Sequence, residues 1–428
     1  MKILHTSDWH AGKVWKGQTR LDELADVLEN LASEIERERI DLVVMTGDIF
    51  DTPSPPPEAE RLVFGFFRRV GRLQVPSVVI AGNHDSPARV EAWAQLAELA
   101  HVTACGLPKP RTAGGVVEIQ AKSGERALVA MVPFAPVARL VSAQEIGNAP
   151  HRAPRTYAAA MQELVGHVCE GFAPGTVNLL LAHTHLEGAA IGGSERRVHV
   201  GEGWAARPQM LPATAHYVGL GHIHLHQQVS GAPAPTWYAG SPLQLDFGEE
   251  GQGKYYNVVD ARPGQPAHVE PRPYVGGRPL RTVTIPPADA MAGAARQALV
   301  AMHPAEAGGA TASETDIAGA AAVGLRNVAI DVTDNPHLRV IVDCTVPQAG
   351  ADINRRVREA IPGVVSVDVR LPAITGEPDV APRTDGSLSP RELYTMFRAA
   401  RREGLAPRRV LDAFDELYEA AIAEERAE

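Results

Sequence analysis

The chain is 428 residues long, which is enough for a large catalytic core together with one or two smaller modules. Hydrophobic residues make up 45% of the sequence, which excludes a disordered chain that lacks the side chains for a core. The formal net charge of -10 gives no overall attraction to nucleic acid, because phosphate backbones attract basic surfaces. Lys13, Lys16 and Arg20 form either a local basic face or ordinary solvated loop charges, so charge alone does not identify the substrate.

Several features of the sequence predict a cytoplasmic protein. The N-terminus begins with a strand-like segment, without the basic stretch and apolar core of a signal peptide. No uninterrupted apolar run reaches the roughly 18 residues that a membrane span needs. The cysteines, Cys105, Cys169 and Cys344, are isolated and lack metal-type spacing, so we expect them to be reduced and buried.

The first hundred residues alternate between predicted strands and predicted helices. The strands are expected at residues 2–6, 42–45 and 77–81, and the helices near residues 21–35 and 58–72. Such alternation predicts a mostly parallel sheet that is covered by helices. Ligand sites in these sheets lie at the carboxyl ends of the strands.

After residue 102 the pattern changes to antiparallel strands followed by a second set of strands. We expect strands at residues 114–118, 127–132, 177–182 and 217–220, a helix at 157–168, and shorter strands near 227–229, 236–239 and 255–259. Residues 1–275 are therefore predicted to form an α/β fold, a two-sheet sandwich flanked by helices, with the site along one edge.

The remainder of the chain is predicted to form smaller parts after a turn-rich connector at residues 271–279. Residues 280–372 are expected to form a small α+β domain, with strands at 281–285, 338–345 and 364–371 and helices near 290–302 and 351–361. Within it, the Ala/Gly-rich segment 304–324 is predicted to be a loop.

Residues 375–387 are rich in Pro, Gly and Asp and read as a linker before a helical pair at 388–428. Ser389, Pro390 and Glu392 form a helix-start signature. The second helix carries an apolar stripe from Val410 to Ile422, which must be covered. Packing onto the chain's own core and docking of a partner protein both explain the stripe, and the linker favours a partner.

Short segments that are rich in histidine, aspartate and asparagine end several of the predicted strands. They are Asp8-Trp9-His10, Gly47-Asp48-Ile49-Phe50-Asp51, Gly82-Asn83-His84-Asp85, His183 with His185, and Gly221-His222-Ile223-His224. An isolated Asp-x-His is common, and Gly-Asp and Gly-Asn pairs are often turns. Two histidines that flank one apolar residue at a strand end have little structural use, so the ordered combination predicts a metal site.

The side chains in these segments suit a pair of divalent cations. Asp8 and His10 are two residues apart, so both can reach one ion, and the carboxylate of Asp48 can bridge two ions. Mixed carboxylate and imidazole ligation favours Mn, Fe or Zn over Mg and Ca. Two such ions about 3.5–4 Å apart stabilise the attacking and leaving oxygens of a phosphoryl displacement.

In order and type, the motifs resemble those of the calcineurin-like metallophosphoesterases. Further details are similar to the nuclease subunits of bacterial double-strand-break repair complexes, namely Trp9, the run Gly47 to Thr52, and Tyr238-Ala239-Gly240-Ser241-Pro242. The resemblance covers essentially the whole chain. It implies that residues 1–275 form the nuclease domain, 280–372 a capping domain, and 388–428 a segment that binds an ATPase.

The resemblance also implies roles for individual residues. One metal would be bound by Asp8, His10, Asp48 and His224, and the other by Asp48, Asn83, His183 and His222, with Asp48 bridging. His84 matches the family's catalytic histidine, which faces the phosphate, and Asp85 is expected to orient its imidazole. Asp51 is expected to lie behind the ligands, His185 is left out of the metal set, and His5 and His226 are expected to be structural.

The function that the resemblance implies is a Mn²⁺-dependent DNA nuclease. It would act as a 3'-5' exonuclease on double-stranded ends and as an endonuclease on single strands and hairpins, in repair and recombination. Its partners would be DNA and an SMC-family ATPase, with a homodimer of the chain inside a heterotetramer. The alternative is a stand-alone phosphodiesterase that hydrolyses nucleotides or small phosphodiesters with the same ions.

Overall fold

The fold is taken from a computed structural model, which describes residues 1–135, 157–192, 195, 205–285, 335–343, 350–361, 363–370 and 411. The backbone contacts divide the chain into two units, Met1–Arg370 and Leu371–Glu428. Apart from residue 411, the predicted linker and helical pair lie outside the described residues, as do the predicted helix 290–302 and the loop 304–324.

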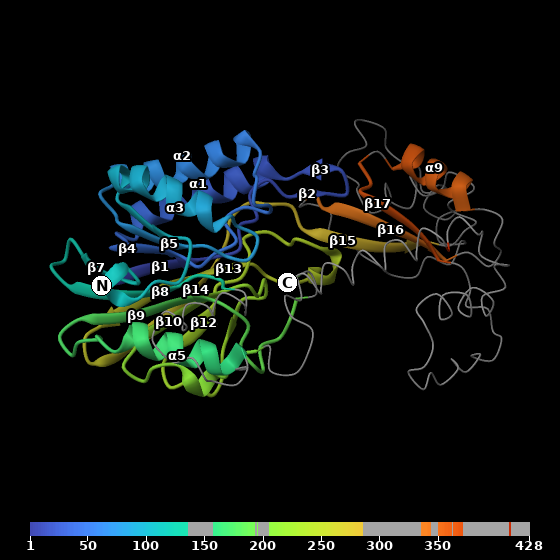
Figure 1. Cartoon of the computed structure of the whole chain (residues 1–428). Helices are drawn as coiled ribbons and strands as arrows, with labels where there is room; N and C mark the ends of the chain where they lie inside the picture. Colours follow the sequence, from blue (N-terminus) through green and yellow to red (C-terminus); the bar gives the residue numbers. More distant parts are fainter. Residues whose placement is uncertain are drawn as a thin grey trace, which may run out of the picture. The chain divides into compact units, whose positions relative to one another are not determined.

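The first unit is built around two six-stranded sheets that lie face to face (Figure 1). The first sheet has the order β14-β13-β1-β4-β5-β6. Its strands are β1 (Lys2–Thr6), β4 (Leu42–Met45), β5 (Ser77–Ile80), β6 (Val102–Cys105), β13 (Tyr255–Arg262) and β14 (Gln265–Pro273). Strands β1, β4, β5 and β6 are parallel, and β13 pairs antiparallel with both β1 and β14. The expected parallel sheet in the first hundred residues is confirmed.

The second sheet has the order β11-β12-β10-β9-β8-β7. Its strands are β7 (Val116–Gln120), β8 (Arg126–Val132), β9 (Val177–His183), β10 (Tyr217–Gly221), β11 (Gln227–Gln228) and β12 (Thr236–Tyr238). Strands β8, β9, β10 and β12 are parallel, whereas the edge strands β7 and β11 run antiparallel to their neighbours.

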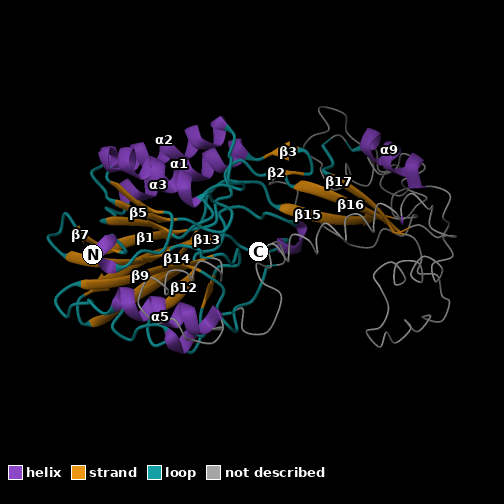
Figure 2. Ribbon diagram, viewed as in Figure 1, coloured by secondary structure: helices purple, strands orange, loops and turns teal. Residues whose placement is uncertain are grey.

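Helices cover the outer faces of both sheets (Figure 2). The first sheet carries α1 (Leu21–Arg37), α2 (Pro57–Arg72) and α3 (Pro87–Ala97), and the second carries α5 (Tyr157–Cys169). Short 3-10 turns are η1 (Glu98–Ala100), η2 (Arg111–Ala113), η3 (Pro208–Met210) and η4 (Phe247–Glu249), and β2 (Val14–Trp15) pairs with β3 (Gln18–Thr19). Buried apolar side chains fill the space between α1, α2 and the first sheet, between the sheets, and between α5 and the second sheet.

The amphipathic pattern of α1 explains why this helix packs where it does. Leu24, Val27, Leu28, Leu31 and Ile35 recur at helical spacing and are all buried against the first sheet. Burial of one such side chain stabilises the fold by about 1.5–3 kcal/mol. The sandwich that the sequence predicts is therefore formed, and it belongs to the α/β class.

A small parallel sheet follows the sandwich. It has the order β15-β16-β17, with β15 (Leu280–Ile285), β16 (His337–Asp343) and β17 (Ser366–Arg370), and α9 (Gly350–Ala360) precedes β17. Trp15, Phe247, Leu280 and Val365 form a buried cluster that joins this sheet to β2 and η4. The boundaries of the predicted capping domain stay a prediction.

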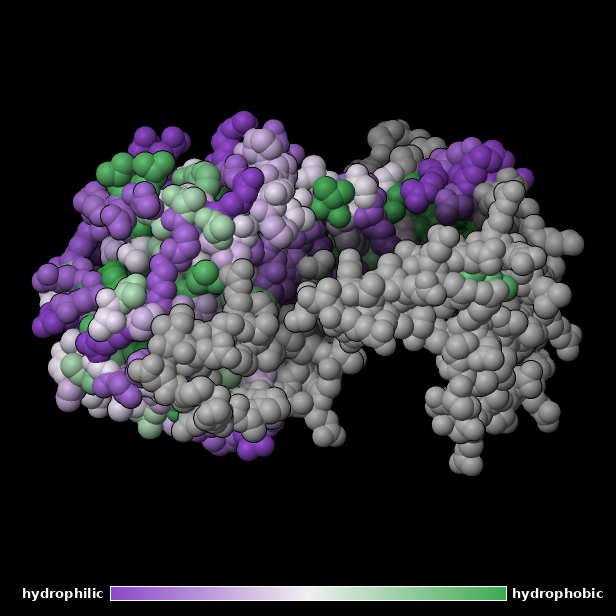
Figure 3. Space-filling model, in the orientation of Figure 1, coloured by the Kyte–Doolittle hydropathy of each residue, from purple (hydrophilic) through white to green (hydrophobic). Residues whose placement is uncertain are grey.

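No helix in the described part of the chain combines the length and the apolar composition that a membrane span needs. The part of the surface that is coloured by hydropathy in Figure 3 is largely hydrophilic, with scattered apolar side chains. The large apolar side chains exposed among the described residues are Val14, Phe64, Leu96, Leu99, Ile191 and Val275.

Candidate metal centre

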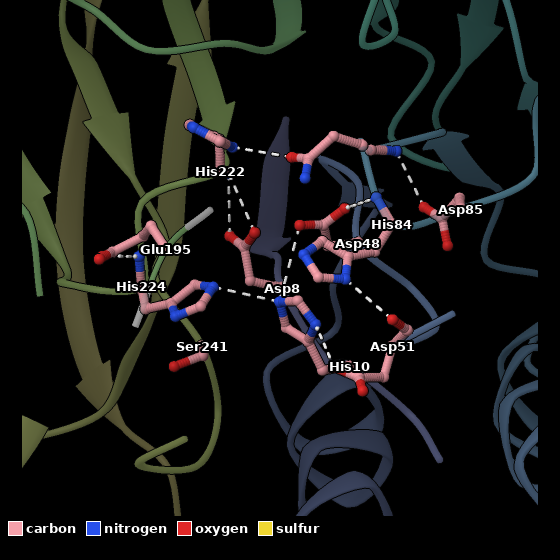
Figure 4. Close-up of polar contacts among 12 residues, drawn as sticks. Asp8, His10, Asp48, Asp51, His84, Asp85, Glu195, His222, His224 and Ser241 are labelled. Atoms are coloured by element: carbon pink, nitrogen blue, oxygen red, sulfur yellow. Dashed lines mark hydrogen bonds and ion pairs between the residues drawn. The ribbon is translucent and has the colours of Figure 1, made fainter. Parts of the chain in front are cut away.

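The motif residues meet at the carboxyl ends of strands from both sheets (Figure 4). The first sheet contributes loops after β1, β4 and β5, and the second contributes the end of β9 and the loop after β10. Figure 4 shows Asp8, His10, Asp48, His84, His222 and His224 turned toward a common centre. The metal ligands predicted from the sequence are thus brought together from segments far apart in the chain.

The backbone at several of these positions is in the left-handed region. The φ angles are 51° at Asp8, 46° at His10, 49° at Asp48 and 99° at His222. Residues other than glycine rarely adopt these angles, and each such residue costs roughly 1–3 kcal/mol. This concentration of strained backbone at one place is typical of a functional site.

Glycines let the strand ends approach one another closely. A Cβ atom on Gly82 would lie 2.1 Å from Oδ1 of Asp48, and one on Gly221 would lie 2.0 Å from the carbonyl oxygen of Thr46. Any side chain at either position would push the metal-binding loops apart.

The first group of ligand atoms belongs to Asp8, His10 and His224. One ligand atom from each lies within 4.8 Å of the other two, and all these side chains are buried. Nε2 of His10 lies 3.1 Å from Nε2 of His224. A cation about 2.1 Å from each of two nitrogens holds them roughly 3 Å apart when the angle between the bonds is near 90°. The spacing therefore fits a shared cation.

The second group of ligand atoms belongs to Asp48, Asn83, His183 and His222. Oδ1 of Asn83 lies 3.0 Å from Nε2 of His183 and 2.8 Å from Nδ1 of His222. The ligand atoms of Asp48, His183 and His222 lie within 4.8 Å of one another. An amide oxygen, a carboxylate and imidazole nitrogens at these distances form a donor set for a second divalent cation.

Asp48 connects the two groups through a single oxygen. Its Oδ1 accepts the backbone N–H of His84 at 2.8 Å. Its Oδ2 lies 3.6 Å from Nε2 of His10 in one group and 3.5 Å from Nε2 of His183 in the other. This position between the two groups is the one that a bridging carboxylate needs.

The electrostatics of the pocket also fit bound cations. Burial raises the pKa of Asp8 to about 7, so a carboxylate here needs neighbouring positive charge. Burial, assisted by the charge on His183, lowers the pKa of His222 to about 3, so this imidazole is neutral and offers a nitrogen lone pair. A divalent cation would supply the missing positive charge and would be bound by the lone pair of His222.

Hydrogen bonds behind the ligands fix which imidazole nitrogen faces the centre. Nδ1 of His183 donates to the carbonyl oxygen of Thr46 at 2.7 Å, which leaves Nε2 for a metal. Nδ1 of His10 lies 3.1 Å from Oδ1 of Asp51, as expected for a residue behind the ligands. Such outer contacts set the tautomer and orientation of metal-binding histidines.

The role predicted for Asp85 needs a correction. Its carboxylate does not orient the imidazole of His84 but accepts the backbone N–H groups of Ile49, Phe50 and Gly82, at 3.1, 2.9 and 2.8 Å. Burial and the charge of Asp48 raise the pKa of Asp85 to about 6. Asp85 thus holds together the loops that carry Asp48 and Asn83.

His84 is oriented by a different group from the one predicted. Its Nδ1 donates to the carbonyl oxygen of Asp51 at 2.8 Å, which leaves Nε2 as the nitrogen for a substrate. One of its ring nitrogens lies within 4.8 Å of ligand atoms of His10 and Asp48. The pKa of His84 is lowered, because the effect of burial outweighs the nearby charge of Asp48, which acts to raise it.

Glu249, Lys254 and Glu195 surround His224 and were not found from the sequence. Oε1 of Glu249 lies 3.2 Å from Nδ1 of His224, and Oε1 of Glu195 accepts the backbone N–H of His224 at 3.0 Å. Nζ of Lys254 lies 2.6 Å from Oε2 of Glu249. Burial raises the pKa of Glu249, but the hydrogen bond with His224 and the charge of Lys254 outweigh burial and lower the pKa to about 2.

The other histidines agree with the sequence analysis. His5 is buried between the hydroxyl groups of Tyr217 and Thr46, at 2.7 and 2.9 Å, and His226 contacts Asn257 at 2.8 Å. These bonds give both residues structural roles. His185 stands 6.3 Å from His222, ring centre to ring centre, outside the groups of ligand atoms described above.

Comparison with known proteins agrees with this geometry. A profile of the calcineurin-like phosphoesterase family matches residues 1–225. The D subunit of the nuclease SbcCD from Bacillus subtilis is 35% identical over 282 residues, which are 65% of this chain and 71% of that protein. The corresponding protein of Rhodobacter capsulatus is 32% identical over 64% of this chain and 70% of that protein.

A third relative is more distant. The SbcCD nuclease D subunit of Escherichia coli K12 is 29% identical over 63% of this chain and 67% of that protein. The chain therefore belongs to the calcineurin-like phosphoesterase family and, within it, groups with the D subunits of SbcCD nucleases. It is a metal-dependent phosphoesterase.

Proposed function

We propose that this chain is the nuclease subunit of an SbcCD-type complex and cleaves DNA phosphodiester bonds at a centre of two divalent cations. The observation that carries the proposal is the position of Oδ2 of Asp48 between His10 and His183, at 3.6 and 3.5 Å. A carboxylate oxygen shared by two donor sets is the arrangement used for in-line displacement at phosphorus.

Asp8, His10, Asp48 and His224 would hold one cation, and Asp48, Asn83, His183 and His222 the other. When bound, the cations neutralise the phosphate and lower the pKa of water, which supplies a nucleophile near neutral pH. The chain's own contribution is to fix the ligands, through Thr46, Asp51 and Glu249, and to place an imidazole beside the centre. Manganese is our proposal for both cations, because mixed carboxylate and imidazole donors favour it over Mg²⁺.

His84 would act on the scissile phosphate. Its protonated Nδ1 is held by the carbonyl oxygen of Asp51, so Nε2 is the nitrogen that meets a phosphate oxygen. A phosphate near this nitrogen favours the protonated imidazole, which then donates to the departing oxygen. The reaction needs no covalent intermediate, because water attacks in line with that oxygen.

The partners and reaction products belong to the same proposal. The relatives are named as the D subunits of the nuclease SbcCD, and that name supports a nucleic-acid substrate and a second subunit. We propose that the substrate is DNA and that the second subunit is an SbcC-like SMC-family ATPase. We further propose 3'-5' exonuclease activity on duplex ends, endonuclease activity on single strands and hairpins, a homodimer within a heterotetramer, and a cytoplasmic location. Residues 388–428 would bind the ATPase, with 280–372 as the capping domain and 375–387 as the linker.

The decisive experiment compares substrates. The purified chain with Mn²⁺ is incubated with end-labelled duplex DNA, with hairpin DNA, and with a small phosphodiester such as bis-p-nitrophenyl phosphate. Cleavage of both DNA substrates is expected. Rapid hydrolysis of the small substrate with intact DNA would instead favour the stand-alone phosphodiesterase.

The partner is tested separately. The full-length chain is expected to co-purify with the SMC-family ATPase, whereas a chain truncated after Gly376 should lose this association and keep its two cations. Equal association of both chains would contradict the role proposed for residues 388–428.

A further inference from the structure

A buried ion pair lies directly behind His224. Glu249 ends η4, its side chain is 0% exposed, and its Oε2 lies 2.6 Å from Nζ of Lys254. Its other oxygen, Oε1, lies 3.2 Å from Nδ1 of His224. Removing a carboxylate and an ammonium group from water is costly, and a buried ion pair often adds little to stability. Its position therefore suggests a role beyond folding.

Lys254 secures the backbone of the same histidine. Its Nζ donates to the carbonyl oxygen of His224 at 3.1 Å and to Oγ of Ser241 at 3.0 Å. The backbone N–H of Ser241 also donates to that carbonyl oxygen, at 3.1 Å. One ion pair thus contacts both the imidazole and the main chain of His224.

We propose that Glu249 and Lys254 are positioning residues that hold Nε2 of His224 for one of the two cations. The inference rests on the proposed two-cation centre. Because the carboxylate of Glu249 takes the proton-bearing Nδ1, the lone pair of His224 lies on Nε2, which is 3.1 Å from Nε2 of His10. A carboxylate behind an imidazole also makes it a stronger metal ligand.

The effect should be confined to the cation held by Asp8, His10 and His224. The ligands of the other cation are anchored by different groups. His183 is held by the carbonyl oxygen of Thr46, and its Nε2 lies 3.0 Å from Oδ1 of Asn83. Loss of the ion pair should therefore weaken one binding step and spare the other.

The test separates positioning from folding with three variants. Glu249→Gln keeps the size of the side chain and removes the negative charge that faces Lys254, and Lys254→Met removes the ammonium group that faces Glu249. The double variant removes both charges of the pair, so neither charge is left without the other. Each variant is titrated with Mn²⁺ by calorimetry and by electron paramagnetic resonance, and its thermal unfolding is recorded.

We expect each single variant to lose stability and to bind one Mn²⁺ with roughly 10- to 100-fold lower affinity. The double variant should recover stability but not the affinity, because the carboxylate behind His224 is still missing. Glu250→Gln is the matched control. Glu250 is the next residue along and accepts the backbone N–H of Thr282 at 2.9 Å, so this change should leave both binding steps intact.

Several results would overturn the inference. A double variant that recovers both stability and Mn²⁺ affinity would show that the pair serves folding alone. Equal weakening of both binding steps would contradict the assignment to one cation, and unchanged affinities in every variant would remove the role altogether. A wild-type chain that binds fewer than two Mn²⁺ ions would overturn the proposed function itself, and the inference with it.

Discussion

Nδ1 of His84 donates to the carbonyl oxygen of Asp51, 2.8 Å away, so the orientation of this imidazole is set by backbone. His84→Ser removes the imidazole without touching a ligand atom of Asp48 or His10. Cleavage of DNA should fall by about 10²- to 10⁴-fold, the usual contribution of a general acid. The chain should still bind two Mn²⁺ ions by calorimetry.

The control for this variant is His268→Ser, because His268 lies exposed on β14. It should cleave at the wild-type rate. A His84→Ser chain that cleaves DNA as fast as this control would refute the role of His84.

Replacement of the bridging carboxylate should affect both cations. Asp48→Asn keeps the shape of the side chain but removes the charge of Oδ2, which faces His10 and His183. We expect both Mn²⁺ binding steps to weaken by more than 10-fold, whereas His222→Ala should weaken a single step. Asp260→Asn, on the half-exposed side of β13, is the control. Retention of one unchanged step in Asp48→Asn would contradict the bridge.

Asp85 should matter for stability through the backbone it holds. Its two oxygens accept N–H groups of Ile49, Phe50 and Gly82, and an amide in Asp85→Asn offers only one acceptor oxygen. The free energy of unfolding in urea should fall by about 1–3 kcal/mol, because a buried donor loses its partner. Asp26→Asn, exposed on α1, should leave it unchanged. Equal stabilities would refute this role.

The contribution of Glu23 to stability should depend on pH. Burial raises the pKa of Glu23, but hydrogen bonds with His337 and Arg20 outweigh this and lower it from 4.5 to about 2. A carboxyl group whose pKa is lower in the folded chain than in the unfolded chain stabilises the fold at a pH above the unfolded pKa. This contribution of Glu23 is lost as the pH falls from 4.5 to about 2.

Urea unfolding of the wild type and of Glu23→Gln measures this contribution. The wild type should be more stable at about pH 6, and the difference should shrink at about pH 3, where Glu23 has taken up a proton in the unfolded chain but is still largely ionised in the folded one. A difference that stays constant between these pH values would mean that the contacts with His337 and Arg20 do not depend on ionisation.

The main elements of the sandwich were predictable because each buries one regular face. The helical spacing of Leu24, Val27 and Leu28 predicted α1. Helix α3 was not predicted, because Val90 is its only buried residue and no apolar face shows in the sequence. Strand β14 was read partly as a turn, since Pro271 and Pro273 lie in it. Proline is tolerated there because β14 is an edge strand.

The ligands themselves were predictable because they stand in short motifs, but their supports were not. Glu249 and Lys254 lie far along the chain from most motif residues, in no recognisable pattern, and only the fold of η4 brings them to His224. Asp85 was misread because it follows His84 in sequence. In a tight turn, neighbouring side chains point to different partners.

The side chains of His10 and His224 lie together although 214 residues separate them in the sequence. Strand β1, which precedes His10, lies in the sheet between β4 and the much later strand β13. Contacts of such sequence separation close late in folding. A nascent chain on the ribosome therefore carries half of the metal centre long before the other half has been synthesised. Hydrolysis can begin only after both sheets have emerged, so an unfinished polypeptide has no active site with which to cut.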